Sequence, residues 1–365
     1  MPTIPIPGRS RPIFAVARAW LAAAALVLAA RASFAGAPPA APVWPPPPDR
    51  ARVAFVESWS SPRDFARGLF KRLSNFASGA ASSEAMVKPT GIAVSADGQR
   101  VWVLDAARIA IFAFDRTAHR ARVLSLSGLP VGPLAPFGLA SDAADTLYVT
   151  DQSSHSVVVL SPEGRLLRAF GRDSLARPVG CAVDAKRGLL YVVDTPAGRE
   201  AAHRVGVFTL GGTFVRWLGS RGLENGQFNY PTYVTVSPEG EVHVVDTLNW
   251  RIQVFDAEGK FLRAFGRHGD ARGDFDRPKG VAIDRFSNLY VADGSWDRVL
   301  IFDRSGRALL DFGGRGTWPG GLQEPTAVAV GPDDRIYVAD TNGHRLNVYR
   351  LLETAADSTG GAGRH

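Results

Sequence analysis

The chain has 365 residues, of which 45% are hydrophobic and 21% charged, and its formal net charge is +7. This is the composition of a globular protein, which excludes a disordered or fibrous chain. The single cysteine excludes an intramolecular disulfide and a cysteine-based zinc site. Four arginines and no acidic residue occur in residues 1–35, so much of the positive charge belongs to the N-terminus and does not indicate a nucleic-acid partner.

Residues 1–35 have the order of a secretory signal. Arginines precede an apolar run over residues 19–30, and the small residues Ser33 and Ala35 follow it. Basic, apolar and small residues in this order are typical of a signal peptide, and the run is shorter than the roughly 20 residues of a membrane span. We therefore expect a signal peptide at 1–35 and an exported protein, periplasmic or secreted. An uncleaved N-terminal anchor and a buried helix are the alternatives.

Residues 36–50 are rich in proline and include a run of four prolines at 45–48. Such a segment stays extended as polyproline II and acts as a semi-rigid spacer. We expect a linker here, and the alternative is a ligand for a proline-reading domain.

The segment 64–76 is predicted to be a helix, within an insert at about 62–77. Phe65, Leu69, Leu73 and Phe76 recur at helical spacing, with basic residues opposite them. We expect this helix to cap the domain that follows. A basic amphipathic helix can also lie on an anionic membrane surface or dock to a partner.

Residues 51–353 are dominated by six repeats. Each repeat opens with a proline and a short apolar strand, at intervals of 42 to 53 residues. These prolines are Pro89, Pro136, Pro178, Pro231, Pro278 and Pro325. A second strand ends in an aspartate, namely Asp105, Asp151, Asp194, Asp246, Asp293 or Asp340. Third and fourth strands follow, as in RIQVFD (251–256) and FLRAFG (261–266).

Four short strands per repeat, separated by turn residues, predict one blade of a β-propeller. The fold class is therefore all-β, a six-bladed β-propeller of four-stranded blades at 51–353, with a disordered tail at 354–365. The last repeat ends after its third strand, and VAFVESWS (53–60) offers a strand ahead of the first repeat. We expect this N-terminal strand to complete the last blade, which removes an exposed sheet edge.

The repeats carry a family resemblance. DTLNWRIQVFD (246–256) and DTNGHRLNVY (340–349) resemble the NHL repeat, named for its Asn-His-Leu signature, and the resemblance covers roughly residues 85–353. It implies the propeller fold. It does not single out a function, because the family includes scaffolds, RNA binders, substrate modules of ligases and a few lyases. The N-terminal part also resembles bacterial exported NHL proteins of no assigned activity.

The six aspartates could suggest calcium, but a structural role is more economical. Arg251, Arg298 and Arg345 each follow an aspartate by five residues, and a hairpin turn of that length returns the arginine to the carboxylate. We expect charge-assisted pairs that close these hairpins.

A zinc site is the next candidate, because amidating lyases share this fold. Catalytic zinc needs three converging ligands, whereas His155, His203 and His344 lie in turns of three different repeats. His243 takes a packing position that holds tyrosine or tryptophan in the other repeats, and Cys181 takes the place of a core aliphatic residue. We expect no metal, no cofactor and no catalytic residues.

Aromatic residues gather in the loops that a propeller presents on one face. The candidate ligand-binding residues are Tyr230, Tyr233, Trp250, Trp296, Trp318 and His344. Aromatic residues are enriched at binding hot spots, and the alternative is that each ring packs over a neighbouring blade. Tyr233 replaces a glycine found in four other repeats and is predicted to fill the channel mouth.

The predicted function is that of an exported, non-catalytic recognition scaffold, a monomer that binds a protein, a peptide or an envelope glycan or other cell-envelope polymer. Seven basic and six acidic residues occur in four connections between repeats, so no polyanion-binding surface is indicated and nucleic acid is not expected. The connections are 172–177, 220–230, 267–277 and 314–324. Membrane-surface contact through residues 64–76 stays open. The alternative function is a propeller lyase or lactone hydrolase acting at the channel mouth.

Overall fold

The computed structural model describes residues 41–65, 84–132, 134–198 and 201–352. The predicted signal peptide at 1–35, most of the predicted helix at 64–76 and the predicted tail at 354–365 lie outside these residues. The described start of the helical insert is a short 3-10 helix, η1 (Pro62–Phe65).

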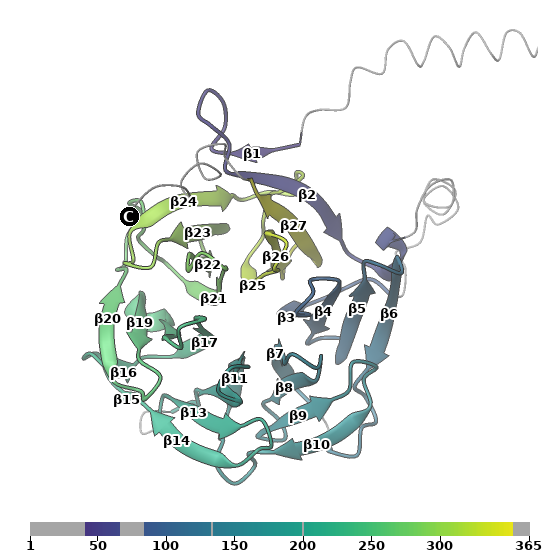
Figure 1. The fold of residues 1–365 in the computed structure, drawn as a ribbon, viewed down its shortest axis with the longest axis vertical. Helices are drawn as coiled ribbons and strands as arrows, with labels where there is room; N and C mark the ends of the chain where they lie inside the picture. The colour runs from purple at the N-terminus through teal and green to yellow at the C-terminus, as the bar shows by residue number, and fades with distance from the viewer. Residues whose placement is uncertain (1–40, 66–83, 133, 199–200, 353–365) are drawn as a thin grey trace, which may run out of the picture. The chain divides into compact units, whose positions relative to one another are not determined.

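Six antiparallel sheets surround a central axis, which confirms the six-bladed propeller (Figure 1). Blade 1 consists of β3 (Pro89–Val94), β4 (Arg100–Asp105), β5 (Ala110–Asp115) and β6 (Arg120–Ser125). Blade 2 consists of β7 (Pro136–Ser141), β8 (Leu147–Asp151), β9 (Ser156–Leu160) and β10 (Leu166–Phe170). Blade 3 consists of β11 (Pro178–Asp184), β12 (Leu189–Asp194), β13 (Arg204–Thr209) and β14 (Phe214–Leu218).

The second half of the ring repeats this order. Blade 4 consists of β17 (Pro231–Val236), β18 (Val242–Asp246), β19 (Arg251–Phe255) and β20 (Phe261–Phe265), with η2 (Thr247–Asn249) between β18 and β19. Blade 5 consists of β21 (Pro278–Ile283), β22 (Leu289–Asp293), β23 (Arg298–Phe302) and β24 (Ala308–Gly313). Blade 6 consists of β25 (Pro325–Val330), β26 (Arg335–Asp340), β27 (Arg345–Leu351) and β2 (Val53–Trp59). A small parallel pair, β15 (Ser220–Arg221) and β16 (Gln227–Phe228), lies between blades 3 and 4.

Burial explains the composition of the strands. The second and third strands are nearly continuous apolar runs and are buried along their length, as in β22 and β23, whereas the fourth strands are half exposed, as in β10. Continuous apolar runs are typical of strands that are covered on both faces. Each blade packs between two neighbours, so both faces of its inner strands are covered.

The N-terminal strand closes the ring, as predicted. β2 pairs antiparallel with β27, and Trp59 lies opposite Leu346 at the end of this pairing. The Trp59 ring is buried, with its centroid 4.9 Å from that of Phe114 in blade 1 and 5.9 Å from that of Tyr337 in blade 6. The closing strand therefore joins the last blade to the first.

Part of the proline-rich segment is folded onto the propeller. Within the range 36–50, β1 (Val43–Trp44) pairs with the start of β2. The Trp44 ring packs against Tyr349 of β27 at a centroid distance of 5.7 Å and against Trp318 at 6.1 Å. The structure thus places the end of the predicted linker in the packing of blade 6.

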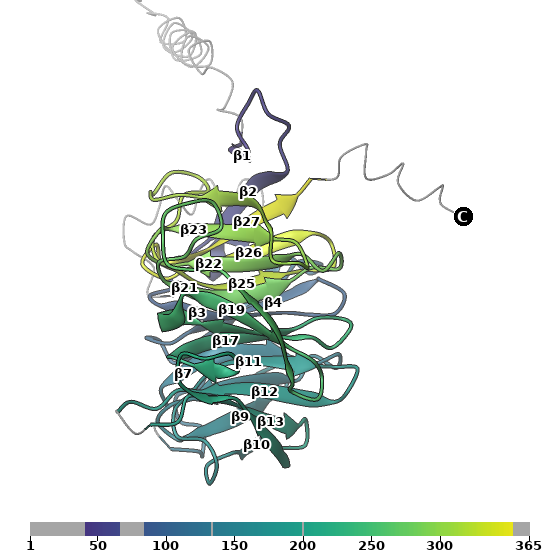
Figure 2. The same ribbon diagram turned by 90° about the vertical axis from the view of Figure 1, so that its left-hand side faces the viewer.

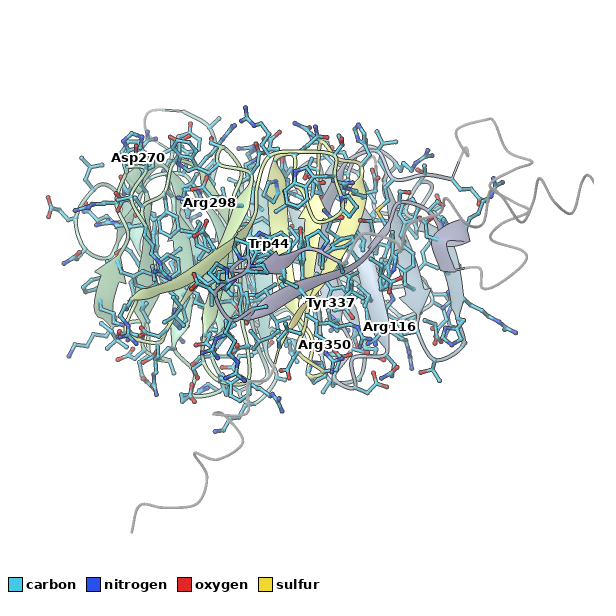
Figure 3. All side chains as sticks on the ribbon, turned by 90° about the horizontal axis from the view of Figure 1, so that it is seen from above. Trp44, Arg116, Asp270, Arg298, Tyr337 and Arg350 are labelled. Carbon is cyan, nitrogen blue, oxygen red and sulfur yellow. The ribbon has the colours of Figure 1, made fainter. Side chains whose placement is uncertain are left out.

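The blades expose two faces, visible when the ring is turned on its side (Figure 2). The turns between second and third strands, and the connections from a fourth strand to the next first strand, emerge together because successive strands are antiparallel. We call this the loop face. Figure 3 shows Asp270, in the connection between blades 4 and 5, on one side of the ring and Arg116, in the turn between β5 and β6, on the other.

Candidate functional site

The six aspartates that end the second strands fasten the loop face to the blades. All six are fully buried. Their carboxylates accept hydrogen bonds from backbone N–H groups of the neighbouring connection, for example Asn229 N at 2.6 Å on Asp246 and Gln323 N at 2.5 Å on Asp340. Burial raises the pKa of Asp246 and Asp340, and these N–H groups and the adjacent arginines oppose that rise. The aspartates therefore tie the end of each second strand to a neighbouring connection through hydrogen bonds.

Two of the three expected arginine pairs are present. Arg251 Nε lies 2.9 Å from Asp246 Oδ2, and Arg345 Nε lies 2.9 Å from Asp340 Oδ2.

The expected pair between Arg298 and Asp293 is wrong. Both carboxylate oxygens of Asp293 already accept backbone N–H groups, from Asp276 and Arg277 at 2.9 Å each. Arg298 instead donates to the carbonyl oxygen of Asp274 at 3.2 Å. A spacing of five residues brings the two side chains near each other, and the neighbouring connection decides which acceptor is free.

The turn histidines stay apart. His155 Nδ1 lies 2.6 Å from the carbonyl oxygen of Ala176, and His344 Nδ1 lies 2.5 Å from that of Val87. His203 Nδ1 accepts the backbone N–H of Tyr230 at 3.1 Å. Each histidine thus contacts a neighbouring connection. Within the described ranges, no group of three or more His, Cys, Asp or Glu side chains could hold a metal ion.

Cys181 and His243, which the sequence places in the core, are both buried. Burial raises the pKa of the Cys181 thiol to about 12. Burial lowers the pKa of His243 to about 4, although the nearby Glu241 carboxylate opposes this shift. Both groups are therefore uncharged at neutral pH, in keeping with packing roles.

Tyr233 closes the central channel from the loop face. It extends from blade 4, and its hydroxyl donates to the carbonyl oxygen of Thr90 in blade 1. The ring is buried and lies 6.0 Å from that of Phe137 in blade 2. Beyond it, the first strands of all six blades line a cavity of about 280 Å³. Tyr233 thus fills the channel as predicted from the missing glycine, and it is not part of an exposed binding surface.

The other candidate aromatics divide into two groups. The side chains of Trp296 and Trp318 are 44% and 40% exposed. Trp250 and Tyr230 are half-buried, with ring centroids 4.9 Å from His268 and 4.6 Å from His203.

Sequence reasoning missed three apolar residues on the loop face. Leu223, Leu248 and Val87 are exposed, and Leu223 is the most exposed large apolar side chain in the described part of the chain, at 69%. Leu223 and Val87 lie in connections, and Leu248 lies in the turn that contains Trp250. Their positions in predicted loops are the sequence signal for these residues, because an apolar side chain in a loop is often exposed.

A polar pocket of about 440 Å³ lies on the loop face between blades 5 and 6. Its lining includes Asp297, Arg315 and Glu324, and Arg315 Nε lies 2.6 Å from Asp297 Oδ2. Lys279 Nζ lies 2.6 Å from Glu324 Oε1. Burial opposes the ionisation of Glu324, but the hydrogen bond from Lys279 and the nearby positive charges outweigh it, so the pKa of Glu324 is lowered. Trp296 immediately precedes Asp297 in the chain, but its side chain is not among the residues that line this pocket.

A family model for the NHL repeat matches residues 322–349, which include β25 and β26. The chain contains an NHL repeat. The brain tumor protein of Drosophila melanogaster is 30% identical to this chain over 122 residues, which are 32% of this chain and 11% of that protein. The chain thus spans about a tenth of the length of this curated relative.

Solved structures with the same fold include two enzymes. A streptogramin B lyase has a TM-score of 0.54 and 16% identity, over 74% of this chain and 95% of its own. A gluconolactonase of Xanthomonas campestris has a TM-score of 0.57 and 18% identity, over 73% of this chain and 87% of its own. At these identities the likeness establishes the β-propeller fold alone.

Proposed function

We propose that this NHL propeller is an exported recognition scaffold that binds an apolar segment of a protein or peptide on its loop face. The observation that carries the proposal is the set of exposed apolar side chains on that face. They are Leu223, Leu248, Trp296, Trp318 and Val87. A contiguous exposed apolar patch is typical of an interaction site, and the proposal is that these loop-face residues together form one.

These residues come from consecutive blades of the ring. Leu223 lies in the connection into blade 4, and Leu248 and Trp296 lie in the turns between the second and third strands of blades 4 and 5. Trp318 lies in the connection into blade 6, and Val87 in the connection into blade 1. Leucine and valine beside tryptophan suit apolar side chains of a polypeptide better than a sugar ring, which stacks on flat aromatic surfaces. A cell-envelope glycan is therefore the alternative outcome of the test.

Preorganisation supports a binding role. The buried aspartates hold the connections through backbone hydrogen bonds, such as those to Asn229 and Gln323. A surface whose loops are already ordered loses less conformational entropy on binding. The loops therefore present their apolar residues in a defined arrangement.

The enzymatic alternative, a lyase or lactone hydrolase at the channel mouth, has the support of a shared fold. A fold of this kind hosts many unrelated functions, so function must be argued from a site. Tyr233 fills the channel mouth, where its hydroxyl contacts a backbone carbonyl and its ring lies near that of Phe137. The loop-face surface is the stronger basis for a function.

Export is part of the proposal and rests on the N-terminal pattern of residues 1–35. None of the helices in the described part of the chain is long and apolar enough to span a bilayer. A reporter enzyme fused after residue 60 should appear outside the cytoplasm, and the mature N-terminus should lie near Gly36. Recovery of the intact N-terminus in membranes would support the uncleaved anchor instead.

Binding is tested on a peptide array with apolar residues at varied spacing, with purified cell-wall polymer as the glycan arm. Trp296→Ala with Trp318→Ala should abolish binding to peptides that the parent retains, while circular dichroism shows that the variant is still folded at the assay temperature. The matched control is Leu167→Ala with Leu262→Ala, which removes two exposed apolar residues from outer strands. If the parent binds cell-wall polymer and none of the peptides, the loop face is a glycan site. If the tryptophan double variant binds peptides as well as the leucine double variant does, the proposed surface is excluded.

A further inference from the structure

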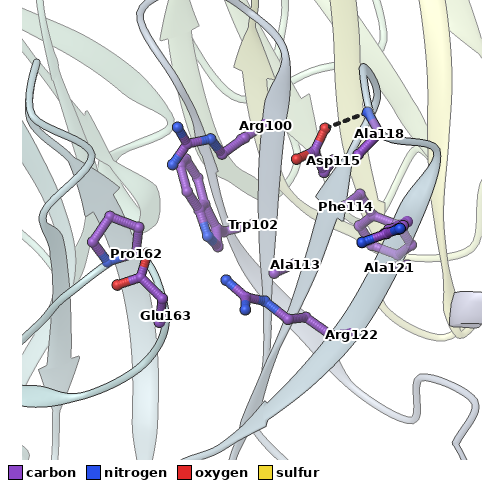
Figure 4. A pocket seen from close by; sticks show the side chains of 11 residues that line it. Arg100, Trp102, Ala113, Phe114, Asp115, Ala118, Ala121, Arg122, Pro162 and Glu163 are labelled. Atoms are coloured by element: carbon purple, nitrogen blue, oxygen red, sulfur yellow. Dashed lines mark hydrogen bonds between the residues drawn. The ribbon is translucent and has the colours of Figure 1, made fainter.

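A groove of about 640 Å³ opens between blades 1 and 2 (Figure 4). It is lined by β4, β5 and β6, by the turn between β5 and β6, and by the turn between β9 and β10. These two turns connect third to fourth strands, so they lie on the side of the ring away from the loop face. The groove is therefore separate from the surface of the proposed function.

Three other boundaries between blades are closed by an arginine. In blades 2, 3 and 4, an arginine of the fourth strand donates to a carbonyl oxygen in the third-to-fourth turn of the next blade. These contacts run from Arg168 to Leu210, from Arg216 to Ala257 and from Arg263 to Arg304. Each such contact fixes the guanidinium against its neighbour.

Arg122 holds the equivalent position in blade 1 but does not make this contact. It lies opposite Ala113 of β5, as Arg168 lies opposite Val159 of β9. Across the described ranges, Arg122 has no hydrogen bond or ion pair. Alanine in place of valine removes two methyl groups beneath the arginine. Both differences open the space between blades 1 and 2.

The pairing register places three arginines over an apolar floor. One cross-strand row contains Arg100, Asp115 and Arg120, and the next row on the same face contains Trp102, Ala113 and Arg122. Residues two apart along a strand point to the same side, so Arg120 and Arg122 share the groove side of β6. Trp102 and Ala113 are buried and form the floor.

The acids around the groove already have hydrogen-bond partners, whereas two of the arginines donate no hydrogen bond among the described residues. The pKa of Glu163 is lowered chiefly by the hydrogen bond from Ser161, and the charge of Arg122 adds to this, so Arg122 faces Glu163 without an ion pair. Asp115 accepts the backbone N–H of Ala118 at 2.8 Å, and Glu163 accepts the Ser161 hydroxyl at 2.9 Å. Arg100 forms an ion pair with Asp145 at 3.1 Å. Arg120, like Arg122, has no hydrogen bond or ion pair in the part of the chain that the structure describes. Their guanidinium donors are free for a ligand.

We propose that this groove binds a small organic carboxylate, a monoanion with a compact apolar body. A carboxylate matches the planar guanidinium fork of arginine and forms charge-assisted hydrogen bonds with it. The apolar body would lie on Trp102 and Ala113. The nearby carboxylates of Asp115 and Glu163 disfavour a dianion more than a monoanion. The volume is within the roughly 300–1,000 Å³ of small-molecule sites.

The test is calorimetric titration of the full chain with benzoate, and with inorganic phosphate as the dianionic comparison at pH 8. We expect the parent to bind benzoate more tightly than phosphate. Arg120→Ala with Arg122→Ala should weaken benzoate binding by about tenfold or more. Ala113→Val restores the side chain of the other blades and should weaken binding by filling the floor, while keeping all three arginines.

The control is Arg267→Ala with Arg307→Ala, which removes the same charge from two exposed arginines elsewhere and should bind benzoate as the parent does. Trp296→Ala with Trp318→Ala should also bind benzoate normally, so failure of the loop-face proposal is distinguishable from failure of this one. The proposal is overturned if the folded parent does not bind benzoate, or if phosphate binds more tightly. It is equally overturned if neither the double arginine variant nor Ala113→Val weakens binding.

Discussion

The hydroxyl of Tyr233 in blade 4 donates a hydrogen bond to the carbonyl oxygen of Thr90 in blade 1, on the opposite side of the central axis. A single side chain thus joins two blades that are three positions apart in the ring. Four other blades have glycine at the position of Tyr233, so this contact comes from one departure from the repeat.

Removal of this hydroxyl should destabilise the ring. Tyr233→Phe leaves a buried carbonyl oxygen without its partner, which should cost about 1–2 kcal/mol of unfolding free energy. Chemical denaturation monitored by tryptophan fluorescence measures this loss. Tyr148→Phe removes a hydroxyl that bonds Asp142 within its own blade and serves as the comparison. Equal stability of Tyr233→Phe and the parent would contradict a bridging role.

Trp59 should be a main determinant of ring closure. Its ring is buried between Phe114 and Tyr337 of different blades, so Trp59→Ala should cost about 3–5 kcal/mol. Val56→Ala in the same strand is the control, because Val56 is exposed. A melting temperature of Trp59→Ala close to that of Val56→Ala would refute the role of this residue in closure.

The aspartate–arginine pairs should differ in their contribution to stability. Arg345→Ala leaves the buried Asp340 carboxylate without its charged partner and should cost about 1–3 kcal/mol. Arg298→Ala should cost less, because both oxygens of Asp293 keep their backbone N–H partners. Thermal unfolding of the two variants side by side measures the order. Arg307→Ala, which breaks an exposed pair with Asp303, should cost less than about 1 kcal/mol.

His243 should make the fold less stable in acid. Burial lowers its pKa in the folded chain to about 4, from an ordinary value of 6.5. Between these values the unfolded chain binds a proton that the folded chain does not, so stability is full above about pH 6.5 and falls as the pH falls toward about 4. The full difference amounts to about 3 kcal/mol. The charged groups near His243 are Glu241, Arg263, Arg304 and Glu239. The pKa of Glu241 is held at about 2, chiefly by its hydrogen bond from Arg263.

Denaturation curves at several pH values test this prediction. His243→Phe should lose the part of the pH dependence that lies between about pH 6.5 and 4. His119→Asn replaces an exposed histidine at a positive φ that asparagine tolerates, and should keep that dependence. The same pH profile in His243→Phe and the parent would show that another group titrates.

The sequence by itself determined the architecture. Six repeats of four strands specify six blades, because each strand has its own apolar run and each turn its own glycine or aspartate. Even the closing strand at 53–60 was predictable, since the last repeat is one strand short and an unpaired apolar strand precedes the first. The position of Tyr233 in the channel was also predictable, because tyrosine replaces the glycine that four other repeats have at this position.

Only the tertiary structure decided which partners these side chains meet. The spacing of Arg298 from Asp293 equals that of Arg345 from Asp340, yet the neighbouring connection fills the acceptors of Asp293 with backbone N–H groups. Trp250 and Trp296 have similar polar neighbours in sequence, but His268 covers one and the other is exposed. The groove beside Arg122 depends on the boundary between blades 1 and 2, where the described residues lack an arginine contact that three other boundaries have. Local sequence specifies strands and turns, whereas these contacts depend on how separate repeats pack in space.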